Sequence, residues 1–322
     1  MVLKSQVEES LAPHAYILWT PQESPVVLVG PEQRPVTLPL IPLPLHGRKM
    51  KSEAPTAIDI GQGVYDYLRQ FPDCPHNVQY AEILRDAYPH FLADLGSQIA
   101  MLDHKDVDAD YVKRKITYLK IFALLEPGKV SLFQTIGIAY YDLALTFSEL
   151  RHCYRHLVSA AAFLQKADHL KSGDVGVQNY LGQIDYLMGD YPGAIRRWSQ
   201  LIPSLADEKI RTLFKEKVAR LEQDGLPEEP MVNHLEAIGA AMAAYGQGSV
   251  REALEIMEYL EEQTPVVQEF PSAQFYVLLA LCRRQTGDTG GAMVALQKAL
   301  ELDPDFGPAK EEMEALTARE TM

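Results

Sequence analysis

The chain has 322 residues, enough for one elongated repeat domain or two compact domains. With 47% hydrophobic and 23% charged residues, its composition is typical of a soluble globular protein, and wholesale disorder is not expected. The formal net charge of −14 argues against a general nucleic-acid binder, because neutralising phosphates requires a basic surface.

The acidic residues are concentrated in the last third of the chain. Residues 226–322 hold 17 acidic against 6 basic residues, a net charge of −11, whereas residues 1–225 carry a net charge of −3. One interpretation is a solvated, self-repelling surface that keeps the protein soluble. The other is electrostatic steering of a basic partner.

Cysteine use and the N-terminus bear on the cellular compartment. Cys74, Cys153 and Cys282 are few, odd in number and far apart, which is typical of reduced thiols. The first ten residues lack the apolar region of a signal peptide, and the longest apolar stretches are too short to span a bilayer. We expect a cytoplasmic protein without membrane insertion.

Residues 1–55 form a proline-rich N-terminal extension that differs from the rest of the chain. Frequent prolines exclude a helix and any central strand, but Val26–Val29 and Val36–Leu40 could form a small hairpin. The LPLIPLPL segment, Leu38–Leu45, is instead typical of an extended, polyproline-like strip. Two alternatives stay open: the strip packs on its own domain, or it docks on another chain.

From residue 57 onward, apolar residues recur at helical spacing, and no convincing strand follows residue 56. We therefore predict an all-α body with a helical region at 56–128 and a second region at 129–322. Three similar glycine-containing turns stand out in the second region, at Met188–Ala194, Tyr245–Ala253 and Thr286–Ala292. Glycine there would supply the left-handed residue that ends the first helix of a hairpin.

These turns belong to a longer recurring pattern of small and apolar residues. Gly287 is preceded by Tyr276, Leu279 and Ala280 and followed by Ala292, Leu296, Ala299 and Pro304. Similar frames surround Gly248 and Gly189, although the latter lacks the final proline. The pattern resembles the tetratricopeptide repeat, a helix–turn–helix unit of about 34 residues. The resemblance covers about half of the chain and is clearest for 234–306.

The repeat spacing is irregular. First helices are expected to start near residues 130, 175, 234 and 273, and an additional helix at Asp207–Glu222 fills the longest interval. In the first unit, the partner signature of Ala160, Leu164 and Ala167 arrives late, so we expect stretched helices or a long turn there.

The resemblance implies an all-α, right-handed helical-hairpin solenoid, capped by the polar Glu311–Ala318 helix, with a concave groove lined by the first helix of each unit. By the resemblance, the groove residues are Gln134, Ile138, Tyr141, Asn179, Gln183, Tyr186, Ile238, Met242, Tyr245, Val277, Leu281 and Arg284.

The implied function is that of a non-catalytic adaptor or scaffold, which binds a peptide or helix of another protein in this groove. The acidic C-terminal region favours a basic partner. The groove could instead be filled by the protein's own N-terminal strip or an extra helix. An alternative function is a structural subunit of a homo-oligomer or multiprotein machine, assembled through residues 1–55.

Signals for an enzyme are sparse, and we predict no catalytic residues, no cofactor and no bound metal. His152 and His156 have a spacing that can hold a metal, but no third ligand is suitably spaced. Asp106, Asp108 and Asp110 imitate the start of a calcium loop, but they more readily cap the following helix. The glycines of Gly61–Gly63 precede a helix without a clear strand before it, which is a weak sign of nucleotide binding.

Overall fold

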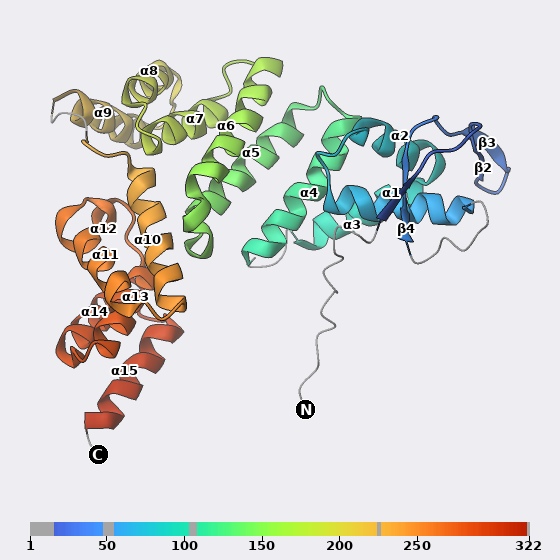
Figure 1. Cartoon of the computed structure of the whole chain (residues 1–322). Helices are drawn as coiled ribbons and strands as arrows, with labels where there is room; N and C mark the ends of the chain where they lie inside the picture. The colour runs from blue at the N-terminus through green and yellow to red at the C-terminus, as the bar shows by residue number, and fades with distance from the viewer. Residues whose placement is uncertain (1–15, 48–54, 103–107, 224–226, 321–322) are drawn as a thin grey trace. The chain divides into compact units, whose positions relative to one another are not determined.

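The computed structural model describes residues 16–47, 55–102, 108–223 and 227–320. The chain divides into two compact units: unit 1 covers residues 1–132 and unit 2 covers residues 133–322 (Figure 1). Asp106 of the calcium-loop hypothesis lies outside the described residues. In the described residues after 55, every regular element is a helix, which confirms the predicted all-α body.

Unit 1 combines two small sheets with a group of helices. β1 pairs antiparallel with β4 and β2 with β3, so the predicted hairpin is present. Its second strand covers Arg34–Thr37 rather than the predicted Val36–Leu40. The bounds are β1 Tyr16–Trp19, β2 Val26–Val29, β3 Arg34–Thr37, β4 Leu43–His46, α1 Ala57–Gln70, α2 Asn77–Ala87, α3 Pro89–Leu102 and α4 Ala109–Leu125.

The apolar strip predicted at Leu38–Leu45 is part of the core of unit 1. Leu38, Leu43 and Leu45 are almost completely buried and share one cluster with side chains of α1 and α2. Gly63 lets α1 approach β4 so closely that a Cβ there would overlap the carbonyl oxygen of Pro44. Of the two alternatives for the strip, the structure shows packing on its own unit.

The described part of unit 2 is built from successive helical hairpins and four additional elements between their helices, which are η3, η4, α9 and α12. The hairpins are α5–α6, α7–α8, α10–α11 and α13–α14, followed by α15. The bounds are α5 Val130–Leu145, η3 Phe147–His152, α6 Cys153–Leu170, α7 Val175–Leu187, α8 Tyr191–Leu201, η4 Ile202–Ser204, α9 Glu208–Gln223, α10 Met231–Gly246, α11 Val250–Gln263, α12 Val266–Glu269, α13 Ala273–Gln285, α14 Thr289–Leu302 and α15 Gly307–Glu320.

The turns inside the hairpins are those expected from the sequence. Gly189, Gly248 and Gly287 each adopt a left-handed backbone conformation, with φ of 86°, 85° and 93°. Asp190 and Asp288 then begin the second helices, and each carboxylate accepts a hydrogen bond from a backbone N–H, at 3.0 and 2.8 Å. The turns at Gly189 and Gly287 therefore end one helix and cap the next, whereas Ser249, after Gly248, makes no capping hydrogen bond.

Small residues allow the helices of unit 2 to cross closely. A Cβ at Gly137 would lie 2.6 Å from Leu164 Cγ, and one at Gly182 would lie 2.6 Å from Trp198 Nε1. A Cβ at Gly239 would overlap the backbone of Arg151 in η3, so α10 packs directly on this turn. Large side chains at these positions would separate the hairpins and expose the apolar faces that they bury.

Among the described helices, none is by itself both long and apolar enough to cross a bilayer, although Val130–Leu145 and Phe147–Leu170 reach this length and hydropathy as a pair bent by 103°.

Two glycines of unit 1 provide a matched test of the packing between α1 and β4. We expect Gly63→Ala to lower the free energy of unfolding by about 1–3 kcal/mol, because the added methyl group overpacks the contact with Pro44. Gly96→Ala in α3 has no neighbour within 4 Å and should raise stability by about 0.5–1 kcal/mol. Urea unfolding of the full chain, followed by Trp19 fluorescence in a Trp198→Phe background, measures both. Equal changes in the free energy of unfolding for Gly63→Ala and Gly96→Ala would contradict the close contact between Gly63 and Pro44.

Candidate binding crevice in unit 2

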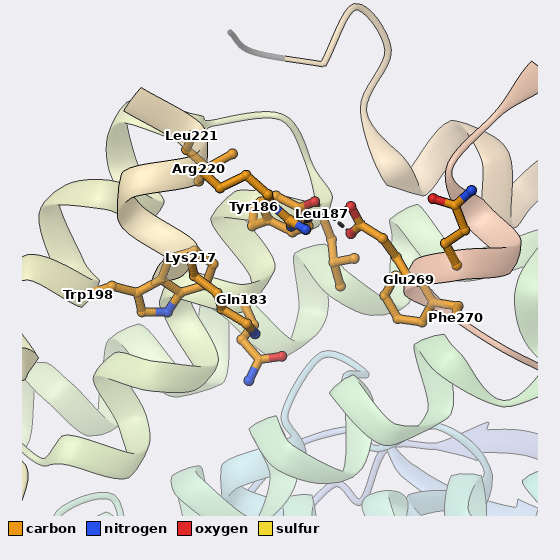
Figure 2. Close-up of a pocket in the computed structure, with 10 residues that line it drawn as sticks. Gln183, Tyr186, Leu187, Trp198, Lys217, Arg220, Leu221, Glu269 and Phe270 are labelled. Atoms are coloured by element: carbon orange, nitrogen blue, oxygen red, sulfur yellow. Dashed lines mark hydrogen bonds and ion pairs between the residues drawn. The ribbon is translucent and has the colours of Figure 1, made fainter. Parts of the chain in front are cut away.

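Three cavities of unit 2 have one lining residue in common, Glu269 at the end of α12. Their volumes are about 310, 590 and 690 Å³. The first two also share Tyr186 and Arg220, and the first and third share Phe270. We call the three together the crevice. Its first cavity is drawn in Figure 2.

The walls of the first cavity come from one repeat and from two of the additional helices. α7 and α8 supply Tyr186 and Trp198, α9 supplies Lys217 and Arg220, and α12 precedes Phe270. Trp198 is held in place by the close α7–α8 crossing at Gly182 and is only 2% exposed. The apolar base of this cavity is therefore rigid, and the charged groups stand on the inserted elements.

A hydrogen-bonded group spans the crevice at the boundary between the first and second cavities. The Tyr186 hydroxyl donates to Glu269 Oε2 at 2.6 Å, and Figure 2 shows the two side chains pointing toward one another. Arg220 Nη2 approaches Glu269 Oε1 only to 3.5 Å, and the Arg220 side chain is 52% exposed. Burial, and then the bond to Glu269, raises the pKa of Tyr186, so the hydroxyl remains a proton donor.

The first and second cavities differ in charge. In the first, Lys217 Nζ lies 5.6 Å from the centre of the Trp198 ring, a cation–π distance. The second cavity is lined by three acidic residues, Glu228, Glu229 and Glu269. Its basic lining residues are Arg220 and His234. Acidic groups therefore dominate the second cavity, which also has tyrosines in its walls.

The third cavity is mainly apolar. It lies among the end of α5, η3, α10, the segment after α12 and the end of α14. Leu150, Leu235 and Ile238 line it, together with Phe270 and Phe306. The crevice thus combines an acidic hollow, a mixed one and one whose lining has a larger apolar share, although Gln274 and Asp303 also line the last. Such different environments suit different side chains of one ligand.

Three of the predicted groove residues line the crevice: Gln183 in the first cavity, Tyr186 in the first and second, and Ile238 in the third. The remaining predicted residues do not line these three cavities. Gln134, Ile138, Asn179, Met242 and Leu281 are partly buried, and Val277 is buried. The Asn179 Oδ1 atom is buried and has no hydrogen-bond partner among the described residues.

The third predicted groove residue of each repeat occupies one recurring position, which holds Tyr141, Tyr186, Tyr245 and Arg284. These side chains link helices of unit 2 to later ones. Tyr141 donates to Gln183 Oε1 at 2.8 Å, and Tyr245 accepts from Gln285 Nε2 at 2.6 Å. Arg284 pairs with Glu312 of α15. Together with the Tyr186–Glu269 bond, each of these side chains reaches a helix that comes later in the chain.

The residues of the crevice that the sequence analysis did not assign to the site are mostly on inserted elements. Trp198 lies on α8 within a repeat, whereas Lys217 and Arg220 lie on α9, and Glu269 and Phe270 lie at the end of α12 and just after it. One feature of the sequence could have indicated these residues. Where the first helices of successive repeats start more than about 34 residues apart, the extra residues form an insertion, and the insertions carry these side chains. α9 fills one such interval and α12 fills another.

The candidate metal ligands have other contacts. His156 and Glu149 form a buried pair, with Nε2 and Oε2 3.1 Å apart, and burial lowers the pKa of His156. His152 stacks edge-on against the His156 ring. Within the described residues, no group of three or more His, Cys, Asp or Glu side chains could hold a metal ion.

The other enzyme hypotheses correspond to packing features. Gly61–Gly63 lies inside α1 rather than before it, and Gly63 serves the contact with β4. Asp108 stands at the start of α4, although its side chain makes no capping hydrogen bond. Burial raises the pKa of Cys153 to about 12 and that of Cys282 to about 11, which is the reverse of an activated thiol.

Comparison with known proteins gives similarity only at the level of structure. No protein-family model matches the chain, and no curated protein matches its sequence. A tetratricopeptide repeat protein from Parabacteroides merdae ATCC 43184 is 14% identical over 81% of this chain and 92% of that chain, with a TM-score of 0.26.

Two further solved structures are similar at the same level. YrrB, described as a tetratricopeptide repeat protein with an unusual peptide-binding site, is 14% identical over 71% of this chain and 91% of that chain, with a TM-score of 0.23. A chain of the APC/C hetero-tetramer Cut9–Hcn1 is 16% identical over 81% of this chain and 56% of that chain, with a TM-score of 0.27. Because these scores are low, the fold assignment rests on the hairpins described above, and unit 2 is a solenoid of tetratricopeptide-like repeats.

Two tyrosines of the recurring position differ in burial and provide a test of their structural role. Tyr141 is only 8% exposed, so Tyr141→Ala should lower the free energy of unfolding of unit 2 by about 3–5 kcal/mol. Tyr245 is partly exposed and bonds to an exposed glutamine, so we expect Tyr245→Ala to cost about 1 kcal/mol. Trp198 fluorescence during urea unfolding, in a Trp19→Phe background, compares them. Similar decreases in the free energy of unfolding would mean that Tyr141 contributes no more to stability than Tyr245.

Proposed function

We propose that unit 2 is a non-catalytic adaptor module that binds a segment of a partner protein in the crevice. The observation that carries this proposal is that three cavities share Glu269 as a lining residue. Adjoining hollows that differ in polarity suit successive side chains of a peptide better than one compact small molecule. Aromatic walls supply contact area at a low cost in conformational entropy, which is typical of protein-binding surfaces.

A cytoplasmic location fits this role. The three cysteines are unpaired in the structure, and two of them are buried in unit 2 as ordinary core residues. This thiol use is typical of a reducing compartment. We therefore extend the proposal to a cytoplasmic adaptor.

The first test fills the crevice without removing a core side chain. Gln268 is exposed and lines the first and second cavities, so Gln268→Trp should block both while preserving the fold. The matched control is Gln297→Trp on the exposed face of α14, which lines none of the three cavities. A random peptide phage library is selected on the full chain, and the Kd of enriched peptides is measured for all three proteins.

We expect the enriched peptides to bind the original chain and Gln297→Trp equally and to bind Gln268→Trp at least about tenfold more weakly. Failure to enrich any peptide, or equal binding to all three proteins, would show that the crevice is not a peptide site. Far-UV circular dichroism of each variant verifies that the helical content is unchanged.

A second candidate function is self-association through unit 1, and the occupant we propose is a second copy of the chain. Val26 and Leu28 are 58% and 57% exposed, on the face of β2 opposite the buried Val27. Leu18 and Leu40 add further exposed apolar area to this unit. Apolar side chains on a two-stranded ribbon with open edges are typical of a surface that another chain covers.

Deletion of residues 1–55 would be an unsuitable test of self-association, because Leu43 and Leu45 belong to the core of unit 1. The double change Val26→Lys with Leu28→Lys alters only exposed side chains. We expect the mass by light scattering to fall from a multiple of 36.1 kDa to that of the monomer, while Glu32→Lys in the adjoining turn leaves it unchanged. A monomeric original chain, or an unchanged oligomer in the double variant, would remove this candidate.

A further inference from the structure

We infer that the crevice selects partner segments with an arginine or lysine anchor, which replaces Arg220 on the Glu269 carboxylate. This inference rests on the proposed peptide-binding function and adds the chemistry of the residue that is recognised. Glu269 lines all three cavities, and its carboxylate bonds to Tyr186, which lines the first and second, so a ligand that spans these two cavities passes the carboxylate.

The Glu269 carboxylate is positioned firmly but is incompletely used. Its Oε2 atom accepts from Tyr186 at 2.6 Å, and its side chain is only 21% exposed. The Arg220 contact to Oε1, at 3.5 Å, is longer than the 2.7–2.9 Å typical of a charge-assisted hydrogen bond. A carboxylate offers about four acceptor positions, so a well-oriented guanidinium could use Glu269 better than Arg220 does.

The internal competitor is easily displaced. Half of the Arg220 side chain is exposed, and its pairing with Glu269 spans two inserted helices, α9 and α12. Rotation of Arg220 into solvent costs little free energy, because the guanidinium is already partly hydrated and an exposed ion pair contributes little to stability. Arg220 therefore occupies the Glu269 carboxylate only until a better-oriented cation displaces it.

The second cavity supplies the remaining complementarity to a cation. Glu228 and Glu229 line it, and the Glu229 side chain is 56% exposed, with its Oε2 atom 3.8 Å from His234 Nδ1. Tyr191 and Tyr259 are also in its walls and can contact the flat face of a guanidinium or the stem of a lysine. This charge balance favours a basic anchor over an acidic side chain or a free carboxylate.

The test uses pools of short capped peptides with random flanking residues and one fixed central residue: arginine, citrulline or glutamate. Citrulline keeps the shape of arginine but lacks its charge. Each pool is titrated against the full chain, Glu269→Gln, Arg220→Gln and Gln268→Trp. The charge-matched controls on exposed positions of α11, outside the crevice, are Glu255→Gln and Arg251→Gln.

We expect the arginine pool to bind the original chain about tenfold more tightly than the citrulline pool. Glu269→Gln should abolish this preference, since its amide can still accept from Tyr186 but cannot pair with a cation. Arg220→Gln should tighten binding of the arginine pool, because the competitor is gone. The two α11 controls should match the original chain.

The contrary outcomes separate the two proposals. If all pools bind equally and Gln268→Trp weakens them, the basic-anchor inference is wrong and the peptide-binding function stands. If Arg220→Gln weakens binding and the glutamate pool is preferred, Arg220 itself holds an anionic ligand, and the inference is again overturned. If no pool binds, the proposed function fails and the inference fails with it.

Discussion

The close helix crossings at glycine are the constraint on which unit 2 depends. A single helical hairpin cannot bury its apolar face, so each must stack on its neighbours. Gly137, Gly182 and Gly239 bring helices so near that a methyl group would collide with the facing residue. The rigid cavity walls follow from this packing, because Trp198 is fixed by Gly182 and α10 is fixed on η3 by Gly239.

The irregular parts of the solenoid supply its chemistry. The hairpins bury mainly alanine, leucine and other apolar residues, whereas the inserted α9 and α12 bring Lys217, Arg220 and Glu269 into the crevice. An insertion does not have to satisfy the repeat pattern, so it is free to carry charged side chains. In this protein the repeats provide the scaffold together with Gln183 and Tyr186, and the interruptions between them provide most of the charged groups of the candidate site.

The predicted groove residues illustrate how one helix position can serve two purposes. At the recurring tyrosine position, Tyr141 and Tyr245 tie one repeat to the next through their hydroxyl groups. Tyr186 instead bonds to Glu269 of α12, an element that follows the α10–α11 hairpin, while α9 lies between its own repeat and that hairpin in the chain. The same residue type therefore stabilises the stack at two positions and borders cavities at the third.

The sequence by itself determined the helical hairpins, their glycine turns, the extra helix at Asp207–Glu222 and the short N-terminal hairpin, because these depend on local backbone preferences and apolar periodicity. It also placed Gln183, Tyr186 and Ile238 among the groove candidates, since repeat position dictates which face of a helix they occupy. Only the tertiary structure decided that Leu43 and Leu45 are core residues and that Glu269 lines three cavities. Such contacts join segments far apart in the sequence, as Tyr186 and Glu269 do across 83 residues, and no local pattern encodes which partners will meet.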